Sequence, residues 1–187
     1  MELALIRHPR TKIAADVCVG QLDVELAAGW EAHVDRLTKV LPSPDRLYSS
    51  PLQRCRRFAT RLGAAYGAQP QLDERLRELH FGEWEGRRWS EIDRAESDPW
   101  AADYLHSAPP GGESYQAMLA RVDAFLAGLG ASFERVAVVS HAGPMRAFLV
   151  RCLDLAPEAA WKFDVGYGRL TRLSERGGSW RLEVLNA

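Results

Sequence analysis

The chain has 187 residues with a formal net charge of −1, and 47% of its residues are hydrophobic. This length suits one domain with a sizeable core, while the balanced charge argues against a nucleic-acid-binding surface. No apolar run approaches the roughly 20 residues of a membrane-spanning helix, and the N-terminus does not have the pattern of a signal peptide. The three cysteines, Cys18, Cys55 and Cys152, form no disulfide framework, so we expect free thiols in a reducing cytoplasm.

The N-terminal half predicts strands that alternate with helices. Residues 2–7 are mostly apolar, as is typical of a central strand in a parallel sheet. In Ser50-Pro51, the serine can cap a helix and the proline suits its first position. The elements expected here are, in order, a strand at 2–7, an irregular loop at 12–26, a helix at 27–41, a strand at 46–49 and a helix from Ser50 to Tyr66.

The C-terminal half continues this alternation after one interruption. Residues 83–110 are polar and rich in tryptophan, so we expect a lid-like insertion with short helices. The elements expected around it are an extended segment within 70–76, helices at 114–129, 144–153 and 157–163, a strand at 135–139, and a terminal hairpin of 168–174 with 179–185. The alternation favours an α/β fold, a three-layer α/β/α sandwich with a mainly parallel sheet. We expect residues 1–187 to form a single domain.

Two of the predicted strands are followed within two residues by a histidine. His8 follows the first strand, and His141 follows the strand that precedes the helix beginning at Pro144. Because ligands of an open parallel sheet bind at the carboxyl ends of the strands, we expect both side chains at one site. Arg54, in the first turn of the helix after Ser50, and the free N–H groups of the Pro144 helix would reach the same edge.

These residue types suit the transfer of a phosphoryl group. The planar guanidinium groups of Arg7 and Arg54 can bind phosphate oxygens, and His141 with helix-end amides can bind others. A neutral nitrogen of His8 can attack phosphorus and form a phosphohistidine, which divides hydrolysis into two steps. The sequence therefore predicts a small-molecule phosphomonoester as substrate, without a nucleic-acid or membrane partner, and it is compatible with a homodimer.

The leaving oxygen needs a proton, and two nearby carboxylates could supply it. Glu78 and Glu83 both flank the start of the insertion, and either is a candidate. A rival nucleophile is also present, because Cys55 and Arg61 have the spacing of cysteine-dependent phosphatases. Cys55 lies within a predicted helix, however, and that chemistry needs the cysteine in a loop that directs amides towards phosphate.

Five segments, in the same order, resemble the motifs of the histidine phosphatase superfamily, which has the phosphoglycerate-mutase-like fold. They span nearly the whole chain, and together they are specific. The segments are Leu5–Thr11, Tyr48–Arg54, Arg75–Glu78 with Phe81–Gly86, Pro110–Ser114, and Val138–Gly143. The resemblance implies that no metal or other cofactor takes part. It also implies a role for each matching residue. His8 is the phosphorylated nucleophile, and Glu78 is the general acid, with Glu83 as second choice. The phosphate is bound by Arg7, Arg54, His141 and Ala142, and His141 also stabilises the transition state.

Within the superfamily, Val17–Leu26 resembles a stretch of the α-ribazole phosphatases, which dephosphorylate α-ribazole 5′-phosphate in cobalamin biosynthesis. Two positions depart from the family pattern. Pro9 replaces the usual glycine and removes a backbone N–H near the phosphate pocket, and Val19 replaces the expected tyrosine. The residues expected to contact the rest of the substrate are Gln21, Glu83 and Trp84.

The sequence alone is compatible with three functions. We expect a metal-independent phosphomonoesterase, with α-ribazole 5′-phosphate as the preferred substrate and a broad range of sugar or organic phosphates as the alternative. A mutase that moves phosphate within a sugar acid is the second. A non-catalytic protein that binds a phosphorylated ligand, suggested by Pro9, is the third.

Overall fold

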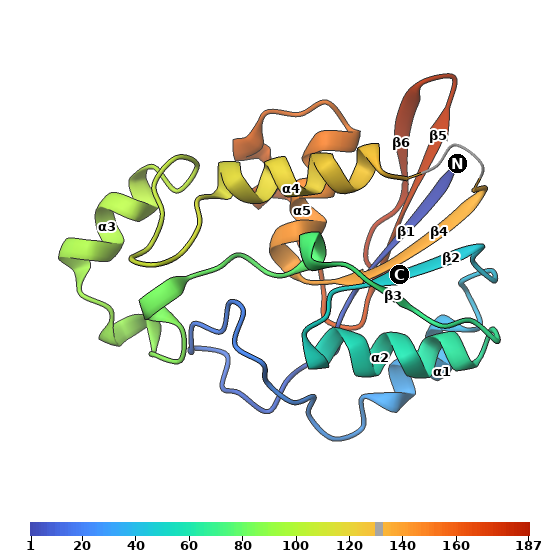
Figure 1. Cartoon of the computed structure of the whole chain (residues 1–187), viewed down its shortest axis with the longest axis horizontal. Helices are drawn as coiled ribbons and strands as arrows, with labels where there is room; N and C mark the ends of the chain where they lie inside the picture. Colours follow the sequence, from blue (N-terminus) through green and yellow to red (C-terminus); the bar gives the residue numbers. More distant parts are fainter. Residues whose placement is uncertain (130–132) are drawn as a thin grey trace.

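A computed structural model describes residues 1–129 and 133–187 of the chain. Its centre is a six-stranded sheet with the strand order β3-β2-β4-β1-β5-β6 (Figure 1). The strands β1 to β4 run parallel, and β5 and β6 form an antiparallel hairpin in which β5 pairs with β1. The strands are β1 Glu2–Arg7, β2 Arg46–Ser49, β3 Gln71–Leu72, β4 Arg135–Ser140, β5 Leu170–Arg176 and β6 Ser179–Val184.

Helices lie on both faces of this sheet, with α4 and α5 on one side and α1 and α2 on the other (Figure 1). The α-helices are α1 Glu31–Leu37, α2 Gln53–Ala64, α3 Arg94–Ala102, α4 Tyr115–Ala127 and α5 Ala142–Cys152. The 3₁₀ helices among the described residues are η1 Glu74–Leu76, η2 Gly82–Trp84, η3 Trp89–Glu91 and η4 Pro157–Lys162.

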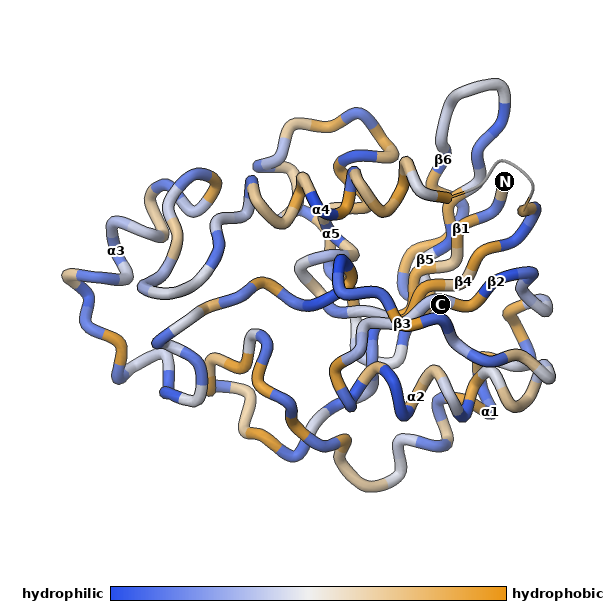
Figure 2. Tube along the Cα trace, viewed as in Figure 1, coloured by the Kyte–Doolittle hydropathy of each residue, from blue (hydrophilic) through white to orange (hydrophobic). Residues whose placement is uncertain are grey.

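The strand β1 is apolar because helices cover both faces of the sheet. Leu3 and Leu5 belong to a buried cluster with residues of α4 and α5, whereas Ala4 and Ile6 belong to a second cluster with residues of α1 and α2. Since successive strand side chains point to opposite faces, each helical layer receives every second residue. Figure 2 shows the resulting apolar centre along the inner strands. The predicted three-layer α/β/α sandwich with a mainly parallel sheet is confirmed.

The helix predicted over 27–41 is shorter than expected, because α1 covers only Glu31–Leu37. Gly29 has a φ of +78°, outside the helical region, so the helix cannot begin before it. Beyond Leu37 the chain makes tighter turns, in which the Val40 N–H donates to the Leu37 C=O at 3.0 Å.

The start of α2 also differs from the prediction, since the helix begins at Gln53 instead of Ser50. Leu52 is extended, with a ψ of 135°. The cap comes from another part of the chain, because the Gln53 N–H donates to Oδ1 of Asp23 at 2.6 Å. The long loop before α1 is therefore attached to the N-terminal end of α2, while the Ser50 hydroxyl accepts from the Leu52 N–H at 3.4 Å.

Residues 83–110, the predicted insertion, form an arm that carries η3 and α3 away from the sheet (Figure 1). The base of this arm has a small core of its own, in which Cys18, Trp84 and Ile92 are buried together. Among the described residues, no helix combines the length and apolar character needed to cross a membrane. All three cysteines are free and buried.

Candidate active site

Three adjacent parallel strands, β1, β4 and β2, end at the same edge of the sheet. The His8 N–H donates to the Ser140 C=O at 3.0 Å, and the Ser50 N–H donates to β4 at 3.0 Å. The helix expected from Pro144 begins at Ala142, so its N-terminus directly follows His141. The two strand-end histidines, His8 and His141, therefore lie side by side, with ring centres 5.1 Å apart.

His8 is buried, with 5% of its surface exposed, and its orientation is fixed by its own neighbour. Nδ1 lies 2.7 Å from the Pro9 carbonyl oxygen. Because that oxygen can only accept a hydrogen bond, the contact assigns the proton to Nδ1 and leaves the lone pair on Nε2. Desolvation, followed by the charges of Arg54 and Arg7, holds the pKa of His8 well below its usual range. The imidazole is therefore neutral, which a nucleophile requires.

Pro9 keeps the part of the backbone that this arrangement uses. Proline has no N–H to donate, but its carbonyl is intact and accepts from His8. Pro9 thus provides the acceptor that sets the tautomer of His8, and its ring fixes φ in the turn that follows the nucleophile.

Arg54 is buried, with 2% of its surface exposed, and connects three parts of the chain. Its Nη2 and Nη1 donate to the carbonyl oxygens of Gly20 and Leu22, both at 2.6 Å, and its Nε donates to Nδ1 of His141 at 3.1 Å. A guanidinium has five N–H donors. Two therefore remain for a bound anion, and the three in use hold the loop before α1 against the strand ends.

His141 is completely buried and lies behind Arg54. Its Nδ1 accepts from Arg54, and its Nε2 is 2.9 Å from Oγ of Ser50. Desolvation and then the charge of Arg54 hold the pKa of His141 well below its usual range. The structure thus gives His141 contacts that orient Arg54, and its predicted contact with phosphate stays a prediction, as does that of Ala142 beside it.

A cavity of about 160 Å³ lies in front of these strand ends. Four of the predicted residues share it, namely Arg7, His8, Arg54 and Glu78. Its remaining walls are mostly apolar and come from the loop before α1, the segment before the insertion and the turn before β5: Thr11, Val17, Val19, Gly20, Phe81 and Tyr167. The cavity is small compared with the roughly 300–1,000 Å³ of typical small-molecule sites, so it suits a phosphate group and the atoms next to it.

Glu78 lines this cavity, and one of its two carboxylate oxygens accepts hydrogen bonds from the backbone. Its Oε1 accepts from the backbone N–H groups of Gly143 and Leu79, both at 3.0 Å. The other oxygen, Oε2, has only a long contact of 3.4 Å with the Gly143 nitrogen and can carry a proton. Glu83, the second candidate, is exposed and does not line the cavity.

Arg7 is held from two sides by the turn before β5. Its Nη1 donates to the Val165 carbonyl at 2.6 Å, and its guanidinium carbon lies 3.6 Å from the ring centre of Tyr167. Within residues 1–129 and 133–187, its Nε is buried without a hydrogen-bond partner. Burial lowers the pKa of Arg7, yet an arginine keeps its charge at neutral pH.

Tyr167 is a site residue that sequence reasoning missed. It lines the cavity, stacks on Arg7, and meets the His8 ring edge-on with centres 5.6 Å apart. No local pattern marks it, and its place follows from the topology, because Leu170 begins a strand antiparallel to β1 and pairs with Ile6. The residues just before that strand must therefore lie at the carboxyl end of β1.

Two residues expected to contact the substrate have other partners. The amide of Gln21 donates to the Glu78 carbonyl at 3.0 Å and does not line the cavity. Trp84 is buried in the core of the insertion, where its Nε1 donates to Glu96 at 3.0 Å, and it does not line the cavity either. The large apolar ring of Trp84 buries more of its surface in the small core of the insertion than it would at the edge of a polar cavity.

Glu85, which the sequence did not single out, fixes the loop above the cavity. Its Oε1 accepts from the backbone N–H groups of Gln21 and Phe81, both at 2.9 Å. A Cβ atom on Gly20 would lie 2.2 Å from that oxygen, so only glycine fits there. Glu85 thus joins the loop before α1 to the segment before the insertion.

The cysteine alternative is not supported by the geometry. Cys55 lies inside α2 and is fully buried, with Sγ 3.5 Å from the Ser140 carbonyl oxygen. Burial raises the pKa of the Cys55 thiol, so the thiolate that would act as nucleophile is disfavoured. Arg61, its supposed partner, lines a different pocket on the outer surface of α2.

Comparison with known proteins gives a consistent match along the chain. A family model described as the histidine phosphatase superfamily (branch 1) matches residues 3–187. An adenosylcobalamin/alpha-ribazole phosphatase of Escherichia coli is 29% identical, and the alignment covers 100% of this chain and 96% of that protein. A glucosyl-3-phosphoglycerate phosphatase of Mycobacterium tuberculosis is 33% identical, with coverage of 99% and 94%. The crystal structure of the alpha-ribazole phosphatase from Shigella flexneri has a TM-score of 0.92 at 28% identity, with coverage of 100% and 96%.

Proposed function

Since this chain belongs to the histidine phosphatase superfamily, we propose that it hydrolyses phosphomonoesters through a phosphohistidine on His8. The observation that carries the proposal is the contact of Nδ1 with the Pro9 carbonyl, which leaves Nε2 as a neutral nucleophile in a cavity shared with Arg7 and Arg54. Such a pair of guanidinium groups can balance the charge of a phosphate dianion.

In the first step, Nε2 of His8 attacks phosphorus, and the bond from phosphorus to the leaving oxygen breaks as the N–P bond forms. The negative charge spread over the equatorial oxygens is stabilised by the N–H groups of Arg7 and by the two donors that Arg54 has not used. Glu78 delivers a proton from Oε2 to the leaving oxygen, so that an alcohol departs.

In the second step, water attacks phosphorus and the N–P bond breaks. Glu78, now a carboxylate, takes the proton of that water, and Nε2 of His8 regains its lone pair as inorganic phosphate forms. His141 holds Nε of Arg54 in place through both steps. The proposal assigns no step to a metal, because these side chains supply the nucleophile, the proton and the positive charge.

We propose α-ribazole 5′-phosphate as the substrate. Support comes from the E. coli and Shigella relatives, which align over the whole chain and carry that activity in their names. The rim of the cavity is consistent with a neutral leaving group, since Val17, Val19 and Phe81 are apolar.

A phosphorylated sugar acid is the second candidate, favoured by the 33% identity to a glucosyl-3-phosphoglycerate phosphatase. Such a substrate carries a carboxylate near its phosphate. Among the described residues that line the cavity, Arg7 and Arg54 are the cations, and both are needed for the phosphate. A second anionic group would have no partner inside, which disfavours this class and the related mutase reaction.

The test is a phosphate-release screen of the purified chain in EDTA with α-ribazole 5′-phosphate, ribose 5-phosphate, 3-phosphoglycerate and 4-nitrophenyl phosphate. We expect turnover in EDTA, with the highest kcat/KM for α-ribazole 5′-phosphate and no interconversion of phosphoglycerates. Phosphoglycerate interconversion without net phosphate release would indicate a mutase. Tight phosphate binding without any turnover would indicate a binding protein and contradict the proposal.

A further inference from the structure

The catalytic cavity is too small to enclose a whole organic phosphomonoester. Its volume of about 160 Å³ is below the usual range for a whole small molecule. The part of the substrate beyond the phosphate must therefore contact another surface. Aromatic side chains are the usual partners of a flat ring, so their positions around the cavity indicate where such a ring can lie.

The tryptophans of the insertion have already found partners within the chain. Trp84 is buried, and its ring packs edge-on against Trp100 with centres 5.4 Å apart. Trp89 stacks on Trp100 at an interplanar angle of 23°, with centres 6.4 Å apart. Phe81 lines the cavity, but its ring meets both Trp89 and Trp100 edge-on. Trp84 therefore has no free face, and Trp89, although 40% exposed, does not line the catalytic cavity, where Phe81 is the aromatic residue from this side.

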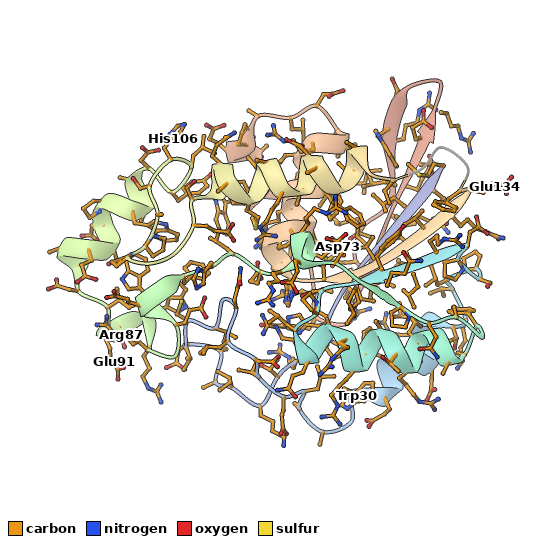
Figure 3. The ribbon with its side chains drawn as sticks, viewed as in Figure 1. Trp30, Asp73, Arg87, Glu91, His106 and Glu134 are labelled. Carbon is orange, nitrogen blue, oxygen red and sulfur yellow. The ribbon has the colours of Figure 1, made fainter. Side chains whose placement is uncertain are left out.

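A second cavity, of about 190 Å³, is lined by Pro9 and Arg10, the two residues that follow the nucleophile in the chain. Pro9 is also the residue that orients His8, and Tyr167 lines both this cavity and the catalytic one. Its walls come from three segments of the chain: Pro9 and Arg10, Ala27 to Gly29 with Trp30 and His33, and Tyr167. Figure 3 labels Trp30, which lies at the start of α1 below α2.

The lining of the second cavity suits a planar, electron-rich group. Trp30 and Tyr167 contribute aromatic side chains to its walls, and the small residues Ala27, Ala28 and Gly29 line the rest of it. The guanidinium carbon of Arg10 lies 5.1 Å from the ring centre of Tyr167, so Arg10 can stack on a bound ring as well. Within the described part of the chain, the Arg10 side chain forms no ion pair.

We propose that this second cavity binds a planar ring of the substrate that is joined to the phosphate through a spacer. The inference rests on the proposed phosphomonoesterase activity. Because Tyr167 lines both cavities, a ring in the second cavity must be separated from a phosphate in the first by a spacer, and we take a pentose as that spacer. A nucleoside-like monophosphate, in which ring, pentose and phosphate follow in that order, has this architecture.

The experiment compares α-ribazole 5′-phosphate with ribose 5-phosphate, which has the same spacer and phosphate but no ring. The readout is the ratio of the two kcat/KM values, which isolates the contribution of the ring. We expect Trp30→Ala to lower this ratio at least about fivefold, since an aromatic stacking surface is lost. Ala28→Trp, which fills the cavity while keeping the packing of Trp30 on Phe58, should lower it similarly. Trp89→Ala, in the insertion, is the matched control and should leave the ratio unchanged.

Two results would overturn the inference alone. One is an unchanged ratio in both Trp30→Ala and Ala28→Trp. The other is a ratio lowered by Trp89→Ala and not by the cavity variants, because the ring would then lie against the insertion. If the unmodified chain hydrolyses neither ester, the proposed function fails and the inference fails with it.

Discussion

Replacing Glu78 by glutamine separates its role in proton transfer from its role in the structure. In the folded chain, Oε1 accepts two backbone N–H groups, from Gly143 and Leu79. The amide oxygen of glutamine can accept both, so we expect the free energy of unfolding to change by less than about 1 kcal/mol. The amide cannot deliver a proton from the position of Oε2. Glu78→Gln therefore removes only the acid.

The expected loss follows from the leaving group. General acid catalysis contributes about 10²–10⁴-fold, which corresponds to roughly 3–5 kcal/mol of the activation barrier. An alkyl leaving group such as ribose needs that proton, whereas 4-nitrophenolate is stable without it. We expect Glu78→Gln to slow phosphorylation of His8 by ribose 5-phosphate at least about 100-fold and to leave phosphorylation by 4-nitrophenyl phosphate within a few-fold.

Rapid quenching of the first turnover measures phosphorylation without the later water-dependent step, in which Glu78 also acts. Glu83→Gln is the control, because Glu83 is exposed and outside the cavity. Urea denaturation of both variants checks that the fold is intact. The reasoning would be refuted if Glu83→Gln, and not Glu78→Gln, slowed phosphorylation by the alkyl ester.

Three further outcomes test the supporting contacts. Gly20→Ala should lower the free energy of unfolding by roughly 1–3 kcal/mol and also lower kcat/KM, because the new Cβ would lie 2.2 Å from Oε1 of Glu85. Gly67 has a similar φ but open space around it, so Gly67→Ala should lower the free energy of unfolding less. Equal urea midpoints for the two variants would contradict this. Iodoacetamide should leave activity intact in the native chain, since burial raises the pKa of Cys55; rapid inactivation that follows alkylation of Cys55 would revive the cysteine mechanism. The two strand-end histidines have folded-state pKa values well below 6.5, so the unfolded chain binds more protons below that pH. Stability should therefore be retained above pH 6.5 and fall below it, by up to about 1.4 kcal/mol per pH unit for each histidine. Urea denaturation at pH 7.5 and 5.5 measures this, and a free energy of unfolding that rises towards pH 5.5 would contradict it.

The fold and the centre of the site could be predicted because both depend on local patterns. An apolar strand followed by a polar residue places that residue at the sheet edge, and this holds for His8 and for His141. The helix starts were less predictable. Ser50 has the right residue type for a cap, yet the cap of α2 is Asp23, which is thirty positions from Gln53 in sequence.

The sequence could not show which of several similar aromatic residues lines the catalytic cavity. Trp84 and Tyr167 are both aromatic residues near glycines, and no local pattern tells which one meets the cavity. The difference lies in the topology, because Tyr167 precedes a strand that pairs with β1, while Trp84 has its own small core to fill. In the same way, Arg54 on an arginine-rich helix was compatible with solvent exposure. Only the fold shows that it is buried against Gly20, Leu22 and His141.

The central claim is that His8 carries the phosphoryl group during turnover. Quenching the chain during turnover of 4-nitrophenyl phosphate, followed by peptide mass analysis at alkaline pH, tests it directly. We expect phosphate on the peptide that contains His8, stable to base and labile to acid, and no such species in His8→Ala, which should also be inactive. Full turnover by His8→Ala, or phosphate found on another residue such as His141 or Cys55, would contradict the account.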